Sequence, residues 1–151
     1  MTNYKIRKLS IKNFKHVANF SIDFSEKDLI VFDGPNGFGK TTLFDALELV
    51  ISGGISRVTN TADGRYGYND LLFSNQNNKD TTIKIEFYNE NENFTVVKRF
   101  NANKSIRPLD RKPDNWNLFE TYLLKNFDSP LSESKPISTE ELHSKLGMRS
   151  L

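Results

Sequence analysis

Apolar and polar residues alternate along four stretches of this chain, at residues 4–14, 20–24, 82–87 and 94–100. A period of two residues is typical of β-strands that bury one face and expose the other. The first two stretches predict one antiparallel pair, and the last two predict a hairpin around the polar turn at 89–93. The alternation therefore predicts half-buried antiparallel strands.

A different pattern occupies residues 41–51, where apolar side chains cover nearly every face of a helix. A helix that is apolar all round is buried, so we expect this one to lie between layers of the fold. Gly53 and Gly54 follow, and glycine after the last turn is a common end of a helix. The stretch 52–80 has little periodicity and many Gly, Asn, Ser and Asp residues, which predicts a long loop.

Two more helices are predicted in the C-terminal part of the chain. Aromatic and apolar residues recur at helical spacing from Trp116 to Phe127, which predicts an amphipathic helix whose stripe faces the core. Residues 138–141, Ser-Thr-Glu-Glu, form a capping box. This box predicts a short helix that ends at Gly147.

Residues 34–41, Gly-Pro-Asn-Gly-Phe-Gly-Lys-Thr, match the phosphate-binding pattern G-x-x-x-x-G-K-[ST]. The apolar run 29–32 predicts a buried strand directly before the motif, and the helix predicted at 41–51 comes directly after it. This strand–loop–helix order is the context that the pattern requires. The motif therefore predicts a nucleotide-binding site.

The chemistry of the motif assigns a task to each part of the loop. Its glycines let successive backbone N–H groups turn inward toward the phosphates, at the positive end of the following helix. The Lys40 ammonium reaches the β- and γ-phosphates, and the Thr41 hydroxyl is placed to ligate Mg²⁺. A nucleotide with Mg²⁺ is thus the expected ligand.

Composition limits the other chemistry that is open to the chain. With 151 residues, 36% of them hydrophobic and 26% charged, the chain has the make-up of one globular domain. It has no cysteine and two histidines, His16 and His143, so we expect no disulfide, no thiolate catalysis and no Cys-ligated zinc. No apolar run approaches the length of a membrane span and no signal peptide begins the chain, so we expect a cytoplasmic protein.

Four pieces of the sequence follow one another in a distinctive order. Ile-Lys-Asn-Phe-Lys at 11–15 ends a strand with Asn-Phe and a basic residue, and a second strand follows at 20–24. The phosphate loop with its paired threonines comes next, and Leu-Phe-Asp-Ala at 43–46 completes the order. In this arrangement the region 9–54 resembles the N-terminal head segment of the ABC-type ATPases that act on DNA, the family of structural-maintenance-of-chromosomes (SMC), SbcC, RecF and RecN proteins.

Two residues depart from the pattern of that family. Phe38 stands where the family usually has serine or another small residue, which alters the outer surface of the loop more than its backbone cradle. Lys15 replaces the commoner arginine, which keeps a cation near the nucleotide and loses any bidentate contact. The resemblance implies ATP as the nucleotide and a full set of cofactor-binding residues: Lys15, Asn36, Gly37, Gly39, Lys40, Thr41 and Thr42, with Thr41 also on the metal.

The resemblance also implies the fold class and the extent of the domain. It implies an α/β P-loop NTPase fold, the N-terminal half of an ABC-type ATPase head, with antiparallel strands that flank the strand–P-loop–helix unit. In that family a C-terminal lobe adds the signature motif, a catalytic Glu and a switch His, and none of these is visible in residues 1–151. We therefore expect a truncated N-terminal lobe, assign no catalytic residue, and expect ATP hydrolysis in the complete protein but not in this fragment alone.

Partners follow from the same resemblance. In the complete protein we expect the C-terminal lobe of the same head and a second head, as a homodimer that sandwiches ATP. Its activity would be coupled to DNA binding or processing in repair, chromosome maintenance or anti-phage defence, and to a partner nuclease. Two alternatives stay open: a non-catalytic nucleotide-binding regulatory module, and the nucleotide-binding subunit of a membrane transporter. The transporter subunit normally carries its signature motif within a lobe of this size, which argues against it.

Cations gather on and after the second predicted hairpin. Six lie between residues 98 and 112, against Asp110 as the one anion: Lys98, Arg99, Lys104, Arg107, Arg111 and Lys112. They are candidates for contacts with DNA phosphates, with Lys104, Arg107 and Arg111 as the selected set. A solvated basic edge that keeps a strand from mispairing explains the segment equally well. The net charge of +2 allows DNA as a partner without requiring it.

Overall fold

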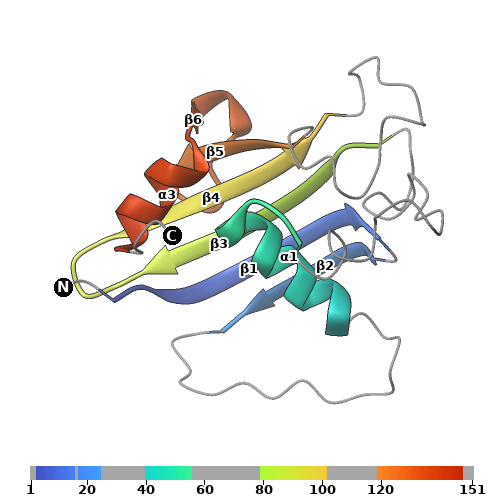
Figure 1. Ribbon diagram of the computed structural model, residues 1–151, viewed down its shortest axis with the longest axis horizontal. Coiled ribbons are helices and arrows are strands. Elements are labelled where there is room, and N and C mark those ends of the chain that lie inside the picture. The colour runs from blue at the N-terminus through green and yellow to red at the C-terminus, as the bar shows by residue number, and fades with distance from the viewer. Residues whose placement is uncertain (1–2, 16, 25–39, 56–78, 102–118, 148–151) are drawn as a thin grey trace.

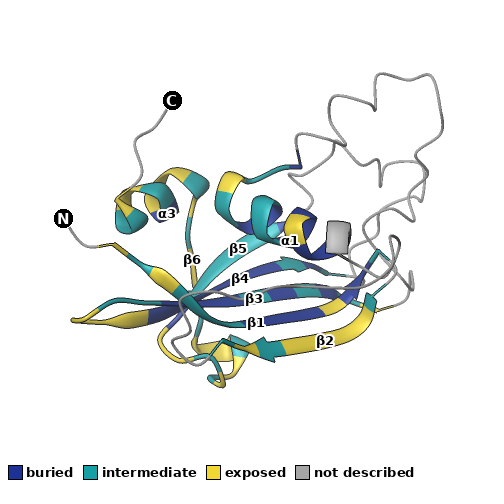
Figure 2. Ribbon diagram, turned by 90° about the horizontal axis from the view of Figure 1, so that it is seen from below, coloured by how far each residue is buried: buried dark blue, intermediate teal, exposed yellow. Residues whose placement is uncertain are grey.

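The computed structural model describes residues 3–15, 17–24, 40–55, 79–101 and 119–147 of the chain. The strand predicted at 29–32 lies outside them. The described residues form one antiparallel sheet with two α-helices on one of its faces (Figures 1 and 2). No helix among them is long and apolar enough to cross a membrane.

Six strands make up the sheet, in the order β2-β1-β3-β4-β5-β6 (Figure 1). Each neighbouring pair is antiparallel. The strands are β1 (Lys5–Phe14), β2 (Val17–Asp23), β3 (Thr81–Tyr88), β4 (Asn93–Phe100), β5 (Glu120–Leu124) and β6 (Lys135–Pro136). The antiparallel pair predicted from the first two alternating stretches and the hairpin predicted from the last two are both confirmed.

Helix α1 (Lys40–Ser52) and helix α3 (Thr139–Leu146) lie on the same face of the sheet (Figure 2). A 3₁₀ turn, η4 (Leu131–Glu133), lies between β5 and β6 along the chain. The helix predicted after the phosphate motif is confirmed as α1. The expectation that it lies buried between layers is wrong for its outer side, because Phe44 is 62% exposed, whereas Ala46 and Leu49 are fully buried.

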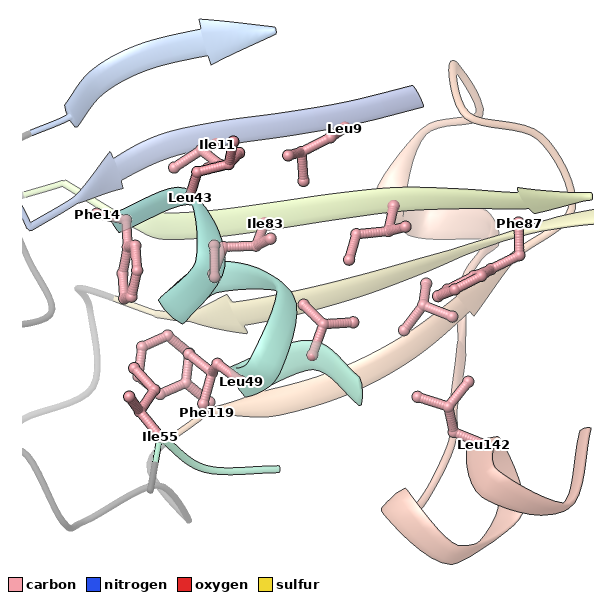
Figure 3. Close-up of a cluster of buried hydrophobic side chains, with 14 of the residues drawn as sticks. Leu9, Ile11, Phe14, Leu43, Leu49, Ile55, Ile83, Phe87, Phe119 and Leu142 are labelled. Atoms are coloured by element: carbon pink, nitrogen blue, oxygen red, sulfur yellow. The ribbon is translucent and has the colours of Figure 1, made fainter. Parts of the chain in front are cut away.

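The core lies between the sheet and the helices (Figure 3). Leu9, Ile85 and Val96 lie opposite one another in the register of β1, β3 and β4, and all three are fully buried. From α1, Ala46 and Leu49 are also fully buried. Because burying one Leu or Ile side chain contributes about 1.5–3 kcal/mol, the alternation of these strands decides which face of the sheet carries the helices.

The amphipathic helix predicted over 116–127 is wrong where the structure describes this region. Residues 120–124 form β5, which pairs with β4 so that Tyr122 lies opposite Val97. Its sequence, Glu-Thr-Tyr-Leu-Leu, contains residues that suit a strand, and a strand here provides hydrogen-bond partners for the outer edge of β4. That requirement comes from a distant part of the chain, so the local helical spacing did not decide the structure.

Both predicted ends of α3 and the predicted end of α1 are confirmed. Ser138 caps α3, since its hydroxyl accepts a hydrogen bond from the Glu141 N–H at 3.0 Å. Gly147 ends α3 in the left-handed conformation, with φ of 75°. Gly53 ends α1 in the same conformation, with φ of 84°, and its N–H donates to the Leu49 carbonyl.

Helix α3 contacts both α1 and the hairpin formed by β3 and β4. Its His143 side chain is hydrogen bonded to the Ile51 carbonyl near the end of α1. Its Lys145 ammonium lies 4.7 Å from the centre of the Phe94 ring and 3.9 Å from the Glu92 carboxylate. Helix α3 therefore links the end of α1 to the turn of the hairpin.

The substitution Gly53→Ala tests the close approach of α1 to α3. A Cβ added at Gly53 would lie 3.1 Å from Thr139 Oγ1, and the φ of +84° is strained for an L side chain. We expect the free energy of unfolding to fall by about 1–2 kcal/mol from this strain, and further because Thr139 must move. Gly147→Ala is the matched control, since Gly147 has φ of +75° and nothing within 4 Å of the added Cβ. Urea unfolding should show the larger loss for Gly53→Ala, and equal losses would contradict the tight contact.

Candidate nucleotide-binding site

The described part of the predicted phosphate-binding segment is the start of α1. Helix α1 begins at Lys40, and Thr41 and Thr42 follow in its first turn, with the Thr42 side chain buried. The helix therefore begins where the motif ends. The other predicted residues of the loop, Asn36, Gly37 and Gly39, lie outside the described residues.

Lys15 is a predicted site residue whose side chain the structure places. It lies just beyond β1, and its ammonium forms a hydrogen-bonded ion pair with Asp45 of α1. Both side chains are largely buried, with 10% of Lys15 and 6% of Asp45 exposed. Asp45 comes four residues after Thr41, and helix residues at this spacing lie on one side of the helix, about 5–6 Å apart. The Lys15 ammonium is thus held about one helical turn from Thr41.

A corner in the backbone precedes this ion pair. Asn13 and Lys15 both have left-handed conformations, with φ of 56° and 53°. Phe14 between them is fully buried, and the centre of its ring lies 5.9 Å from the Lys15 ammonium. Asparagine adopts this conformation more readily than lysine does, and such a conformation costs about 1–3 kcal/mol for residues other than glycine. The contacts of Phe14 and Lys15 hold the corner in place.

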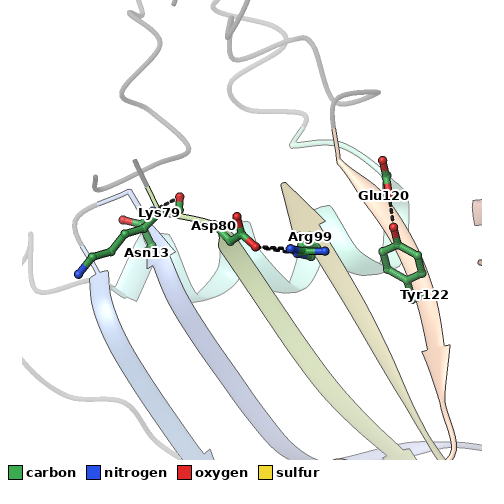
Figure 4. Close-up of polar contacts among 6 residues, drawn as sticks. All are labelled: Asn13, Lys79, Asp80, Arg99, Glu120 and Tyr122. Atoms are coloured by element: carbon green, nitrogen blue, oxygen red, sulfur yellow. Dashed lines mark hydrogen bonds and ion pairs between the residues drawn. The ribbon is translucent and has the colours of Figure 1, made fainter. Parts of the chain in front are cut away.

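Polar contacts tie neighbouring strand ends together beside this corner (Figure 4). The Asn13 side-chain amide donates to the Lys79 carbonyl at 2.8 Å. Asp80 is ion-paired with Arg99, whose Nε lies 2.9 Å from the carboxylate. These contacts fix the chain ahead of β3 from both sides. Sequence reasoning missed both, although the hairpin register pairs Thr82 with Arg99 and so brings Arg99 close to Asp80.

The row of polar contacts continues on β5, where the Tyr122 hydroxyl donates to the Glu120 carboxylate (Figure 4). This hydrogen bond, with burial as the next cause, raises the pKa of Tyr122 above its ordinary value of 10.0. At neutral pH the phenol therefore keeps its proton and acts as the donor of the pair.

The electrostatics at the start of α1 suit an anion. No acidic residue lies in the first turn of α1, so the helix itself does not neutralise the partial positive charge of its free N–H groups. About one turn further along, the Lys15 ammonium neutralises the Asp45 carboxylate, so no uncompensated negative charge of Asp45 lies beside the helix start. No group of three or more His, Cys, Asp or Glu side chains that could hold a metal ion occurs among the described residues. The residues placed here fit the phosphate groups of a nucleotide.

Residues 8–143 match the protein family described as an AAA domain. The chain belongs to this AAA domain family. Its fold is similar to a solved structure from work on ATP-driven dimerization and DNA-stimulated activation of SMC ATPases, with a TM-score of 0.61 and 19% sequence identity. That similarity covers 95% of this chain and 80% of the other chain. The AAA domain therefore has the P-loop NTPase fold of an SMC ATPase head, as the resemblance of residues 9–54 implied.

A relative in sequence is an uncharacterized protein of Methanocaldococcus jannaschii, which is 28% identical to the AAA domain over 99 residues. The matched stretch is 64% of this chain and 11% of the archaeal protein. The AAA domain thus corresponds to a small part of that relative. At the level of the family, the chain is an ATP-binding domain of the P-loop ATPases.

The basic segment of the AAA domain differs from the prediction at its start. Lys98 lies opposite Ile83 on the helix side of the sheet, where it is buried and its ammonium donates to Thr121 Oγ1 at 2.9 Å. Arg99 is engaged with Asp80. Lys98 is thus wrong as a candidate for DNA contact. The residues selected for that role, Lys104, Arg107 and Arg111, and also Lys112, lie outside the described residues.

Burial of Lys98 makes the stability of the AAA domain depend on pH. Burial lowers the pKa of Lys98 below its ordinary value of 10.5, because desolvation disfavours the charged ammonium. Between the lowered pKa and 10.5, the unfolded chain binds more protons at this residue than the folded chain does. The free energy of unfolding therefore rises with pH across this window and is constant with respect to Lys98 outside it.

The substitution Lys98→Met should be neutral or stabilising near pH 7, because an apolar side chain of similar length replaces a buried charge. The stability of the wild-type chain should then rise relative to Lys98→Met as the pH approaches 10.5. Urea unfolding at several pH values between neutral and alkaline measures both effects. The control is Lys12→Met on the exposed part of β1. Parallel pH profiles for wild type and Lys98→Met would show that Lys98 titrates normally.

Proposed function

We propose that this AAA domain binds Mg·ATP at the start of α1, as the N-terminal lobe of a two-lobed SMC-type ATPase head. The start of α1 at Lys40 carries this proposal, because the phosphate motif ends where a helix begins, with no acidic residue in the first turn and the buried Lys15–Asp45 ion pair beside it. The nucleotide would be held by the motif residues and Lys15, that is by Lys15, Asn36, Gly37, Gly39, Lys40, Thr41 and Thr42.

Charge complementarity supports a polyphosphate as the ligand. Lys40 brings a cation to a helix start whose first turn has no acidic residue, and Lys15 neutralises Asp45 one turn further along. The Thr41 hydroxyl would ligate Mg²⁺, which neutralises phosphate charge and orients the phosphates when it is bound. Backbone N–H groups of the loop and of α1 would donate to phosphate oxygens at the positive end of the helix dipole.

The second part of the proposal is that hydrolysis needs further lobes. Phosphoryl transfer depends on positioning and charge stabilisation around the reacting phosphate, including a group that orients the attacking water. We assign this group to the C-terminal lobe of the same head, with a second head completing a homodimer. The exposed ring of Phe44, on the outer side of α1, offers an apolar contact for another lobe. The work on the similar SMC ATPase concerns its ATP-driven dimerization, which supports a homodimer of heads here. The alternative is a non-catalytic module that binds ATP to regulate association.

The substitution Lys40→Ala tests the nucleotide site directly. It removes a charge-assisted contact with phosphate that contributes roughly 1.5–3 kcal/mol, so Mg·ATP should bind at least about tenfold more weakly. Isothermal titration calorimetry on both proteins gives the comparison. Lys125→Ala, an exposed lysine in the turn after β5, is the control and should bind like wild type. Equal affinities of wild type and Lys40→Ala would exclude the assigned phosphate site.

The proposed role also includes DNA. The similar SMC ATPase is described by DNA-stimulated activation, and Lys104, Arg107 and Arg111 follow β4 in this chain. No recognition-helix pattern or base-reading motif occurs among residues 98–112 of the sequence, so binding would be electrostatic and tolerant of DNA sequence. DNA processing with a partner nuclease, in repair, chromosome maintenance or anti-phage defence, is the wider process that this lobe would serve.

Neutralising Lys104, Arg107 and Arg111 together should flatten the dependence of log K on log salt concentration by about 2–3 units, from roughly 0.9 per lost phosphate contact. Fluorescence anisotropy with duplex DNA across a range of salt concentrations measures the slope. The matched control neutralises Lys5, Lys125 and Lys135, three exposed lysines, and changes the net charge equally. An equal change of slope in both variants would show that the net charge alone produces the effect. The segment would then be a solvated basic edge and not a DNA contact.

A further inference from the structure

The ion pair between Lys15 and Asp45 joins two parts of the chain that are distant in sequence. Lys15 belongs to the corner after β1, whereas Asp45 belongs to the second turn of α1. A buried ion pair is an expensive contact, because the desolvation of both charges can exceed their attraction. Its presence here therefore calls for a role beyond stability.

The Lys15 ammonium retains hydrogen-bonding capacity in its buried position. The Lys15 side chain is nine-tenths buried, and its ammonium contacts, within the described part of the chain, one carboxylate oxygen of Asp45 and the face of the Phe14 ring. A lysine ammonium has three N–H donors, so one bond to Asp45 leaves two. These two donors are therefore available to an acceptor outside the described residues.

Strain in the backbone points to the same place. Lys15 has a left-handed φ of 53°, a conformation that is costly for a lysine and that occurs preferentially at ligand-binding sites. The neighbouring Asn13, which is also left-handed, is held by its hydrogen bond to the Lys79 carbonyl and by the Thr81 hydroxyl, which donates to the Asn13 carbonyl at 2.8 Å. The corner is thus fixed on its β3 side by Asn13 and on its helix side by Asp45.

The position of Asp45 along α1 places the Lys15 ammonium near the start of the helix. Asp45 follows Thr41 by four residues, so it lies on the same side of the helix and one turn further from its start. A carboxylate at this place would repel a nearby phosphate if it stood alone. Its ion pair with the Lys15 ammonium offsets this negative charge.

We propose that Asp45 is a positioning residue that holds the Lys15 ammonium against α1, so that the two free N–H donors of Lys15 face the phosphates of ATP. Asp45 itself does not touch the nucleotide. The inference rests on the proposed function, since it requires the nucleotide at the start of α1. It adds that the corner after β1 belongs to the nucleotide site because Asp45 of α1 holds Lys15. ATP would contact Lys15, and Lys15 contacts Asp45.

The substitution Asp45→Asn separates positioning from simple charge. If Asp45 acts only through its charge, its removal makes the site more positive and Mg·ATP binds more tightly. If Asp45 positions Lys15, its removal frees the ammonium and Mg·ATP binds more weakly, by on the order of tenfold, the loss of about one charge-assisted hydrogen bond. The sign of the change in dissociation constant, measured by calorimetry, therefore decides between the two.

A double-mutant cycle shows whether Asp45 acts through Lys15. Lys15→Met should weaken Mg·ATP binding by a similar factor, and Lys15→Arg should retain binding because its guanidinium can bridge carboxylate and phosphate. The double variant combines Lys15→Met with Asp45→Asn, so that each substitution also occurs alone. It should bind Mg·ATP no more weakly than Lys15→Met alone, because Asp45 then has no ammonium to position and its unpaired carboxylate, which would repel phosphate, is gone. Lys12→Met on β1 is the control and should match wild type.

Thermal unfolding of every variant distinguishes loss of folding from loss of binding. Suppose that Mg·ATP binding depends on Lys40 but is unchanged or tighter in Asp45→Asn. That result would overturn this inference while the proposed function stands. The same would follow if the double variant bound as tightly as wild type, because the ion pair would then be structural. Absence of Mg·ATP binding by the wild-type chain would overturn the proposed function and the inference together.

Discussion

Packing of α1 and α3 against one face of the antiparallel sheet is the interaction on which the rest of this domain depends. The buried side chains of β1, β3 and β4 reach this face through strict alternation, with Leu9, Ile85 and Val96 in one row across the strands. Because the side-chain period of a strand is two, a shift of one residue would carry such a row to the opposite face. The register therefore fixes the place of α1, and with it the distance between the corner at Lys15 and the carboxylate of Asp45.

Much of the fold could be predicted from local patterns. The hairpins, α1 and both caps of α3 follow from residues within a few positions of one another, and all were confirmed. Strand β5 could not be predicted in this way. The aromatic residues from Trp116 to Phe127 fit a helical period, while the open edge of β4, more than twenty residues earlier, required a strand beside it. The error thus marks a place where pairing across the sheet prevailed over local spacing.

For the candidate site, too, the sequence predicted the local motifs but not the contacts between distant residues. The motif predicted the helix start at Lys40, and the family resemblance predicted Lys15 as a site residue, but no sequence pattern joined Lys15 to Asp45. That contact and the hydrogen bond from Asn13 to Lys79 span 30 and 66 positions of the chain, so they exist only after the sheet has formed. Lys98 is a second residue whose surroundings the local sequence did not predict. Its positive charge indicated a surface residue, whereas its register opposite Ile83 puts it inside.

Helix α3 has a mechanical consequence that follows from its two sets of contacts. His143 is attached to the last turn of α1, and Lys145 rests on Phe94 and Glu92 at the far end of the β3–β4 hairpin. His143 and Lys145 are two residues apart on one short helix, so the end of α1 and the tip of the hairpin are attached to the same rigid element. A displacement of α1 along its axis would therefore have to carry α3 with it or break one of these contacts.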